Sequence, residues 1–258
     1  MPDLKLALVQ TPLHWHDPAA NRDLLEQRLG AVAADVDLVV LPEMFNTGFT
    51  MAPEAHAEPH DGASVLWMQA MARRLGAVIT GSLAVTEGSG HFNRLHWATP
   101  GGELLTYDKR HLFRMAGEQH HYQAGTRRLV AAIGDWRICP LVCYDLRFPV
   151  WSRNQQDYDL LIYVANWPAA RRERWRRLLQ ARAIENLCYV VGVNRVGIDG
   201  NGVEYSGGSV ALDTLGDTLA DCGDAEGVTT VTLDHAALVA YRERFPAHLD
   251  ADRFTLGP

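Results

Sequence analysis

Cysteine is scarce in this chain of 258 residues, and its spacing excludes two common uses of the residue. The four cysteines, Cys139, Cys143, Cys188 and Cys222, are too few for a disulfide framework. In an extended segment the first two would lie about 13 Å apart, at roughly 3.3 Å per residue, which is too far to bridge. Their C-x3-C spacing has no second Cys or His pair to complete a zinc site. The thiols therefore serve either packing or chemistry.

Long apolar runs are also absent, and positive charge is in the minority. No stretch approaches the roughly 18 apolar residues that suggest a membrane span, and the first residues do not have the layout of a secretory signal. Lys plus Arg is 24 against 31 for Asp plus Glu, a formal net charge of -7. An acidic chain is a poor candidate for binding nucleic acid or an anionic membrane. Since no linker rich in Pro, Gly or Ser divides it, we expect one soluble, cytoplasmic domain spanning 1–258, with a tail from about 245.

Lysine is the scarcest charged residue, because only Lys5 and Lys109 stand among the 24 basic residues. Lys109 lies beside Arg110 in the polar stretch 107–111. A compact ammonium does things that a planar guanidinium cannot, so a lysine among arginines is a candidate for chemistry. Codon bias and an ordinary exposed lysine explain the same observation, and position alone does not separate these readings.

Short β-rich runs alternate with helical stretches, which predicts an α/β fold with mixed strand pairing. Asp17 and Pro18 form a helix-start signature, and the apolar spacing that follows predicts a helix at 21–34. Further helices are predicted at 64–75 and 173–186, and from the capping residue Asp234 to about Arg244. Strands are predicted at 4–10, 38–41, 77–80, 92–99, 104–108, 136–143, 159–165, 189–194, 209–212 and 228–233. Pro140 indicates a sheet edge or a bulge.

Two side chains stand at the carboxyl ends of predicted apolar strands, where the ligands and catalytic groups of α/β proteins gather. Glu43 comes after residues 38–41, and Cys143 ends residues 136–143. From position alone, a capping glutamate and an inert buried thiol explain these two residues as well. Glu118 stands in a stretch that reads as an ordinary polar loop.

Other clusters favour interpretations without chemistry. The pairs His14/His16 and His120/His121 are not set in a recognisable ligand array, so solvated histidines are favoured over a metal site. The arginine-rich run at 171–177 opens a predicted helix in an acidic chain. A solvated helix start or an interface is therefore favoured over nucleic-acid binding.

Three motifs in order resemble the nitrilase, or carbon-nitrogen hydrolase, superfamily: residues 41–43 (LPE), 107–113 (YDKRHLF) and 143–149 (CYDLRFP). The segments 117–118, 165–168, 181–186 and 193–197 resemble it too, and the likeness extends from about Lys5 to the final helix. The resemblance implies an α-β-β-α sandwich of the nitrilase type that pairs into homodimers or higher homo-oligomers. It also implies a catalytic triad of Glu43, Lys109 and Cys143.

The resemblance gives each of these residues a role. Glu43 would be the general base that takes the thiol proton of the nucleophile Cys143. Lys109 and the backbone N–H of Tyr144 would stabilise the charge that develops on the carbonyl oxygen. Glu118 matches the family's second glutamate, which would orient the lysine or the substrate. No metal and no organic cofactor are implied.

Residues 143–154, 165–168 and 194–202 resemble the bacterial ω-amidases most. That branch hydrolyses the terminal amide of short dicarboxylate monoamides such as 2-oxoglutaramate and 2-oxosuccinamate, releasing ammonia and a 2-oxo dicarboxylate. A small-molecule amide substrate is thus implied. The resemblance does not fix the residues that bind it. We expect Trp167 in an aromatic wall and Arg147 or Arg195 as carboxylate partner, although either arginine can instead form a structural ion pair. Nitrilases, N-carbamoyl amidohydrolases and deaminated-glutathione amidases share the triad, so they remain alternatives. A catalytically silent binding protein on the same fold is the alternative from another class.

Overall fold

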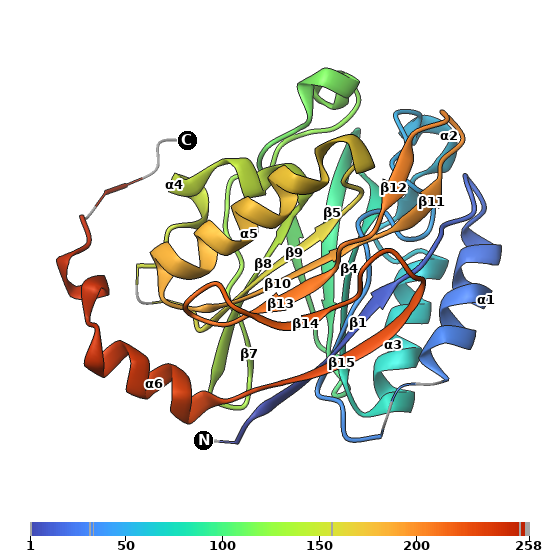
Figure 1. The fold of residues 1–258 in the computed structure, drawn as a ribbon. Helices are drawn as coiled ribbons and strands as arrows, with labels where there is room; N and C mark the ends of the chain where they lie inside the picture. The colour runs from blue at the N-terminus through green and yellow to red at the C-terminus, as the bar shows by residue number, and fades with distance from the viewer. Residues whose placement is uncertain (1, 31, 33, 156, 253, 256–258) are drawn as a thin grey trace.

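The computed structural model consists of two mixed β-sheets packed face to face, with helices on both outer faces (Figure 1). It describes residues 2–30, 32, 34–155, 157–252 and 254–255. The first sheet has the strand order β15-β1-β2-β4-β5-β6, and the short β3 pairs with β4. Its strands are β1 (Leu4–Gln10), β2 (Leu38–Val40), β3 (Glu58–Pro59), β4 (Val78–Glu87), β5 (Gly90–Ala98), β6 (Leu104–Asp108) and β15 (Gly227–Leu233).

The second sheet is built from the middle of the chain and has the order β14-β13-β10-β9-β8-β7. A separate two-stranded hairpin of β11 and β12 follows β10 along the chain. The strands are β7 (Ala131–Ile133), β8 (Trp136–Val142), β9 (Leu160–Ala165), β10 (Tyr189–Asn194), β11 (Val196–Ile198), β12 (Glu204–Ser206), β13 (Val210–Leu212) and β14 (Thr218–Asp221).

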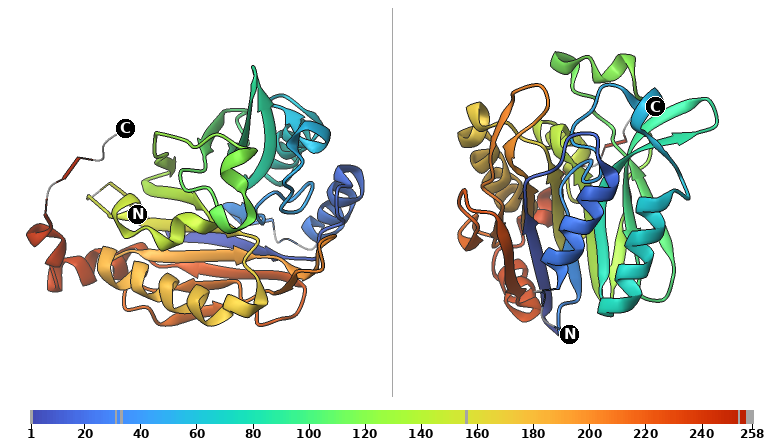
Figure 2. Two further views of the ribbon diagram at one scale, coloured as in Figure 1. Left: turned by 90° about the horizontal axis from the view of Figure 1, so that it is seen from above. Right: turned by 90° about the vertical axis from the view of Figure 1, so that its right-hand side faces the viewer.

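Helices cover the two outer faces, with α1 and α3 against the first sheet and α5 against the second (Figure 2). The α-β-β-α sandwich that the resemblance implied is confirmed. The α-helices are α1 (Pro18–Leu29), α2 (Pro53–His56), α3 (Ala63–Leu75), α4 (Pro149–Ser152), α5 (Arg172–Asn186) and α6 (His235–Arg244). The 3-10 helices are η1 (Arg114–Ala116), η2 (Glu118–His120), η3 (Cys143–Arg147), η4 (Ala169–Arg171) and η5 (Ala247–Asp250).

Strand β1 illustrates how the residue pattern builds these layers. Leu4, Leu6 and Leu8 belong to the core between the two sheets, whereas Ala7 and Val9 belong to the core beneath α1 and α3. Successive side chains of a strand point to opposite faces, so a strand that is apolar throughout can serve both layers. The unbroken apolar run of β1 therefore matches its position between two packed layers.

The direction of the strands brings many loops to one end of each sheet. In the first sheet β1, β2 and β4 run parallel, and β6 shares their direction because β5 is antiparallel to both of its neighbours. In the second sheet β8, β9 and β10 run parallel. The segments that follow β2 and β6 therefore leave from the same end of the first sheet, and those that follow β8, β9 and β10 leave from the same end of the second. Ligands bind at such carboxyl ends in open α/β sheets.

Strand β4 is longer than the predicted 77–80, because Gly81 does not end it. The strand continues to Glu87 and forms a hairpin with β5. A Cβ atom at Gly81 would lie 2.8 Å from the Cβ of Leu41 and 3.0 Å from the ring of Phe45. The glycine therefore permits a close approach inside the sheet, as glycine in a strand often does.

Other predicted boundaries also shift. Helix α1 is capped by Asp17, whose carboxylate accepts a hydrogen bond from the Ala20 amide at 3.0 Å, and it ends at Leu29. The prediction to 34 was wrong, and residues 31 and 33 of it lie outside the described residues. Pro140 lies within β8 and pairs with β9 on one side. On the other side the short β7 pairs only with residues 136–138, so the expectation of a sheet edge at Pro140 was correct. Within the described residues, no helix is both long and apolar enough to cross a bilayer.

Candidate active site

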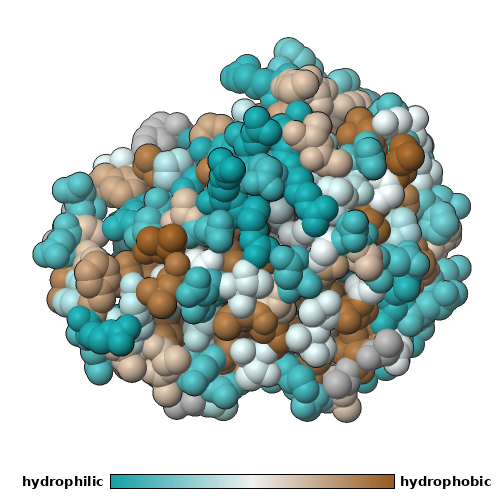
Figure 3. Space-filling view, in the orientation of Figure 1, coloured by the Kyte–Doolittle hydropathy of each residue, from teal (hydrophilic) through white to brown (hydrophobic). Residues whose placement is uncertain are grey.

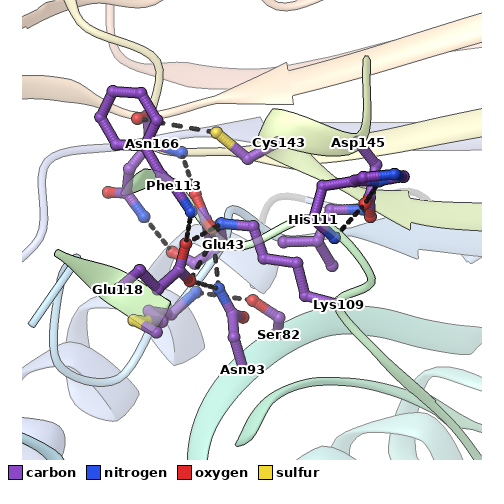
Figure 4. Close-up of polar contacts among 12 residues, drawn as sticks. Glu43, Ser82, Asn93, Lys109, His111, Phe113, Glu118, Cys143, Asp145 and Asn166 are labelled. Atoms are coloured by element: carbon purple, nitrogen blue, oxygen red, sulfur yellow. Dashed lines mark hydrogen bonds and ion pairs between the residues drawn. The ribbon is translucent and has the colours of Figure 1, made fainter. Parts of the chain in front are cut away.

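Glu43, Lys109 and Cys143 lie together at the carboxyl ends of the strands (Figure 4). Glu43 follows β2, Lys109 follows β6 directly, and Cys143 follows β8 directly. The first two come from one sheet and the third from the other, so the group forms only where both sheets end. Glu118, from η2, completes it.

The Lys109 ammonium is held between two carboxylates. Its Nζ donates to Glu43 Oε1 at 2.9 Å and to the two oxygens of Glu118 at 3.0 and 2.9 Å. Both glutamates are 0% exposed and the lysine is 1% exposed. The ammonium thus has three acceptors at hydrogen-bond distance and almost no water, which fixes its position.

Burial and charge compete at these groups. Burial alone lowers the pKa of Lys109, but the charges of Glu118 and Glu43 outweigh it and raise that pKa above its ordinary value. Burial raises the pKa of Glu118, and the nearby Lys109 opposes this rise. The lysine is therefore a permanent cation at neutral pH, as the two neighbouring carboxylates predict.

Two asparagines belong to the same network. The amide of Asn93, inside β5, donates to Glu43 Oε1 at 2.8 Å and to Glu118 Oε1 at 3.2 Å. The backbone N–H of Asn166 donates to Glu43 Oε2 at 2.8 Å, and its side-chain amide donates to the Glu43 carbonyl at 2.6 Å. Both carboxylate oxygens of Glu43 are thus held by donors. The motif analysis gave neither asparagine a role, although Asn166 lies in the ANWP segment.

Cys143 faces open space at the edge of the group. It is the first residue of η3 instead of the last residue of β8, and its φ of 43° lies in the left-handed region. A non-glycine residue in that region carries strain of about 1–3 kcal/mol and is frequent at functional sites. The thiol is 8% exposed, and its Sγ lies 3.9 Å from the carbonyl oxygen of Asn166.

The Cys143 thiol is neutral at ordinary pH. Burial raises its pKa well above the usual value, and the Glu43 carboxylate raises it further by its charge and by a hydrogen bond with the thiol. The charge of Lys109 acts in the opposite direction without overcoming these effects. A neutral thiol beside a carboxylate needs that carboxylate to take its proton before or during attack.

A cavity of about 480 Å³ opens in front of the thiol. The segments after β2, β6, β8 and β9 and the β11–β12 hairpin line it, and Tyr144, Arg147 and Trp167 are among its walls. The Arg147 guanidinium stacks 4.9 Å from the centre of the Trp167 ring. Arg171 also lines the cavity and packs 5.3 Å from the Phe113 ring. Neither arginine forms an ion pair within the described part of the chain.

Arg195, the other arginine expected near the substrate, is not brought to the cavity. It is 0% exposed, and its guanidinium donates to the carbonyl oxygens of Val196, Leu13 and Ile198 at 3.2, 3.3 and 3.4 Å. Its cation also lies 4.7 Å from the Tyr205 ring. The sequence of segment 194–202 gave no indication that the Arg195 guanidinium is directed to backbone carbonyl oxygens and not into the cavity.

The histidines do not gather around a metal position. His16 stacks on His56, with 3.6 Å between ring centres, and such stacked rings do not converge on one ion. Within the described ranges, no group of three or more His, Cys, Asp or Glu side chains is arranged to hold a metal. The arrangement is instead suited to addition of a thiol to a carbonyl group, with a base and a fixed cation beside it.

Comparisons with known proteins agree with this geometry. The family model "Carbon-nitrogen hydrolase" matches residues 5–243. An omega-amidase of Yersinia enterocolitica, YafV, is 51% identical, covering 99% of this chain and 100% of the relative, and a 2-oxoglutaramate amidase of Bacillus subtilis is 30% identical, covering 95% and 96%. A crystal structure of a CN-hydrolase superfamily protein from Xanthomonas campestris, with an arsenic adduct in its active site, is 50% identical, with a TM-score of 0.97 and full coverage of both chains. These matches confirm the resemblance: the chain belongs to the carbon-nitrogen hydrolase family.

Proposed function

We propose that this protein is an ω-amidase that hydrolyses the terminal amide of short dicarboxylate monoamides such as 2-oxoglutaramate and 2-oxosuccinamate. The products are ammonia and a 2-oxo dicarboxylate. The observation that carries the proposal is the buried cluster of Cys143, Glu43 and Lys109 beside a small cavity. Two arginines line this cavity, Arg147 and Arg171, and neither forms an ion pair with a residue that the structure describes. The omega-amidase and 2-oxoglutaramate amidase relatives support the same substrate class.

In the first half of the reaction, Cys143 attacks the amide carbon while Glu43 takes the thiol proton. The negative charge that forms on the carbonyl oxygen is stabilised by the Lys109 ammonium and the Tyr144 backbone N–H. The Lys109 ammonium is held by its carboxylates before the reaction, so this donor needs no reorganisation when the charge appears. Glu43 then returns the proton to the leaving nitrogen, ammonia departs, and a thioester on Cys143 remains.

In the second half, water attacks the thioester carbonyl. Glu43 takes a proton from that water, the same two donors stabilise the second tetrahedral intermediate, and the carbon–sulfur bond breaks. The proton passes from Glu43 to the departing sulfur, which restores the neutral thiol. Glu118 has a positioning role, since its two oxygens hold the ammonium of Lys109. The sequence of steps consumes one water and requires no cofactor.

Arg147 and Trp167 form the proposed recognition site for the distal carboxylate. A guanidinium can donate to both carboxylate oxygens at once, and Arg147 is held over the Trp167 ring with its donors free of any described ion pair. Arg195 is not part of this proposal, because its guanidinium is directed to backbone carbonyls away from the cavity.

Ammonia release from a substrate panel tests the proposal. 2-Oxoglutaramate and 2-oxosuccinamate should be turned over faster than aliphatic nitriles, N-carbamoyl amino acids and deaminated glutathione. Faster turnover of any of these three would move the protein to the corresponding alternative branch. No turnover of any substrate by a protein with a reactive Cys143 would favour the silent binding protein.

The proposal extends to the setting in which the enzyme acts. We place it in the cytoplasm. We also propose that residues 1–258 form one carbon-nitrogen hydrolase domain with a tail from about 245, and the family match over 5–243 supports this domain extent. On the face in Figure 3, apolar side chains gather near the end of α5 and over β13 and β14, where Ile184, Leu215 and Leu219 are exposed. This surface supports a homodimer or a higher homo-oligomer, which native mass spectrometry tests.

A further inference from the structure

Asp145 is a buried carboxylate that the proposed chemistry does not use. It lies in η3, two residues after Cys143, and is 0% exposed. Its Oδ1 accepts from the His111 backbone N–H at 2.9 Å and is 2.8 Å from His111 Nδ1. Its Oδ2 accepts from the Tyr107 hydroxyl at 2.7 Å and from the Val142 backbone N–H at 3.1 Å.

These four contacts join the two segments that carry the oxyanion donors. His111 is two residues after Lys109, and Val142 is two residues before Tyr144. One segment leaves the first sheet and the other leaves the second. The Tyr144 amide lies at the start of η3, where backbone N–H groups have no partner within the helix.

We propose that Asp145 is a positioning residue that sets the separation between the Lys109 ammonium and the Tyr144 N–H, and so holds the oxyanion site in register across the two sheets. This inference rests on the proposed function for the roles of Lys109 and Tyr144. Donors that stabilise an oxyanion must lie about 2.7–3.1 Å from it, so a small shift of one segment loses most of their effect.

The pattern of donors explains why a carboxylate is needed. Each oxygen of Asp145 faces a backbone N–H, from His111 on one side and from Val142 on the other. An asparagine has the same shape, but in either orientation its NH₂ group would meet a backbone N–H that cannot become an acceptor. Asp145→Asn therefore breaks the junction without changing the volume of the side chain.

The matched control is Asp159, a second buried aspartate that is 3% exposed. It binds the guanidinium groups of Arg137 and Arg242 with shortest contacts of 2.9 and 2.6 Å. It precedes β9 and so lies at the amino end of that strand, whereas the site lies at the carboxyl end. Asp159→Asn removes a buried charge of the same type far from the oxyanion donors.

The experiment compares Asp145→Asn with Asp159→Asn by thermal melting, steady-state kinetics and the rate of Cys143 alkylation by iodoacetamide, read by mass spectrometry. Alkylation forms no oxyanion, so it reports on the thiol and its base alone. We expect Asp145→Asn to lower kcat about 10²-fold, with KM and the alkylation rate within about threefold of wild type. Asp159→Asn should lose stability and keep its kcat within about twofold.

A kcat within threefold of wild type in folded Asp145→Asn would overturn the proposal. So would an alkylation rate that falls in parallel with kcat, because the residue would then act on the nucleophile. If Asp145→Asn does not fold, His111→Phe decides: it keeps a ring to stack on Phe148, 3.8 Å away in the native pair, and deletes only the Nδ1 contact. It should lower kcat about 3–10-fold at unchanged KM, and an unchanged kcat overturns the proposal.

The test separates this inference from the proposed function. The kinetics use whichever amide the wild-type protein hydrolyses fastest, because the oxyanion forms on the carbonyl whatever the rest of the substrate is. Failure of the wild type on 2-oxoglutaramate contradicts the proposed substrate class only. Equal kcat values for wild type and the Asp145 and His111 variants contradict the positioning role only.

Discussion

Replacing Lys109 by arginine preserves the positive charge but not the geometry of the site. The ammonium has three carboxylate oxygens within 3.0 Å and is 1% exposed, so the only room beside it is on the side of the cavity that Lys109 helps to line. A guanidinium is longer, planar and spreads its charge over three nitrogens. It can pair with Glu43 and Glu118, but it cannot put one point donor on the forming oxyanion.

Two magnitudes follow from this environment. Loss of one oxyanion donor costs about 10²–10³ in kcat, or about 2.7–4 kcal/mol. Forcing the larger side chain into a closely packed site costs about 1–3 kcal/mol of stability, which lowers Tm by roughly 2–12 °C for a chain of this size. Lys109→Met should be worse for stability, by about 3–5 kcal/mol, because it leaves two buried carboxylates without a cation.

Ammonia release by Lys109→Arg and by Lys5→Arg provides the assay. Lys5 is the only other lysine, and its Nζ binds the exposed Asp35 at 2.6 Å at the surface, where a guanidinium fits as well. We expect Lys109→Arg to lose kcat with little change in KM, since the interaction strengthens in the transition state, and Lys5→Arg to match wild type. Equal, near-normal kcat values for both variants would remove Lys109 from the mechanism.

Three other outcomes are expected. Cys143→Ala should fold normally and show no turnover, and iodoacetamide should label Cys143 faster than the other three thiols; measurable turnover by the alanine variant would refute its role as nucleophile. Arg147→Gln should raise KM for 2-oxoglutaramate about 10-fold or more, as loss of a charge-assisted hydrogen bond of about 1.5–3 kcal/mol predicts, and should leave a simple uncharged amide unaffected; equal effects on both substrates would contradict carboxylate binding. Burial raises the pKa of Cys139 to about 12, so above about pH 9 the unfolded chain loses this proton while the folded chain keeps it. The stability from this thiol is complete below pH 9 and falls by about 1.4 kcal/mol per pH unit up to about pH 12, and urea titrations of wild type and Cys139→Val should differ by that slope; identical slopes would contradict this account.

The position of the site could be predicted from the sequence because it depends on strand ends. Glu43 and Cys143 each follow an apolar strand closely, and parallel strands bring their carboxyl ends to one edge. The pairing of Lys109 with two glutamates came from the resemblance, since nothing in residues 107–111 says which acids lie nearby. The sequence around a residue indicates the strand or loop in which it lies, but not which side chains lie next to it in the folded protein.

The features that the sequence did not reveal depend on the direction of a side chain. Asn93 is one polar residue within a strand, and its contact with Glu43 spans 50 residues of chain. Arg195 and Arg147 look alike in their motifs, yet only Arg147 points into the cavity. From the sequence, Gly81 indicates a strand end. In the structure it lies within β4, where the absence of a side chain permits close packing of Leu41 and Phe45.

The pairing of the first and last strands has a consequence for how the protein is made. β1 pairs with β15 along its whole length, from Leu4 with Leu233 to Gln10 with Gly227. A ribosome must therefore synthesise more than 220 further residues before β1 gains this neighbour, and contacts between distant segments form slowly. During that time one edge of β1 is open to a molecular chaperone or to another nascent chain. Enzymatic activity should accordingly appear only after β15 has left the ribosome, later than the helical signal of the partly synthesised chain.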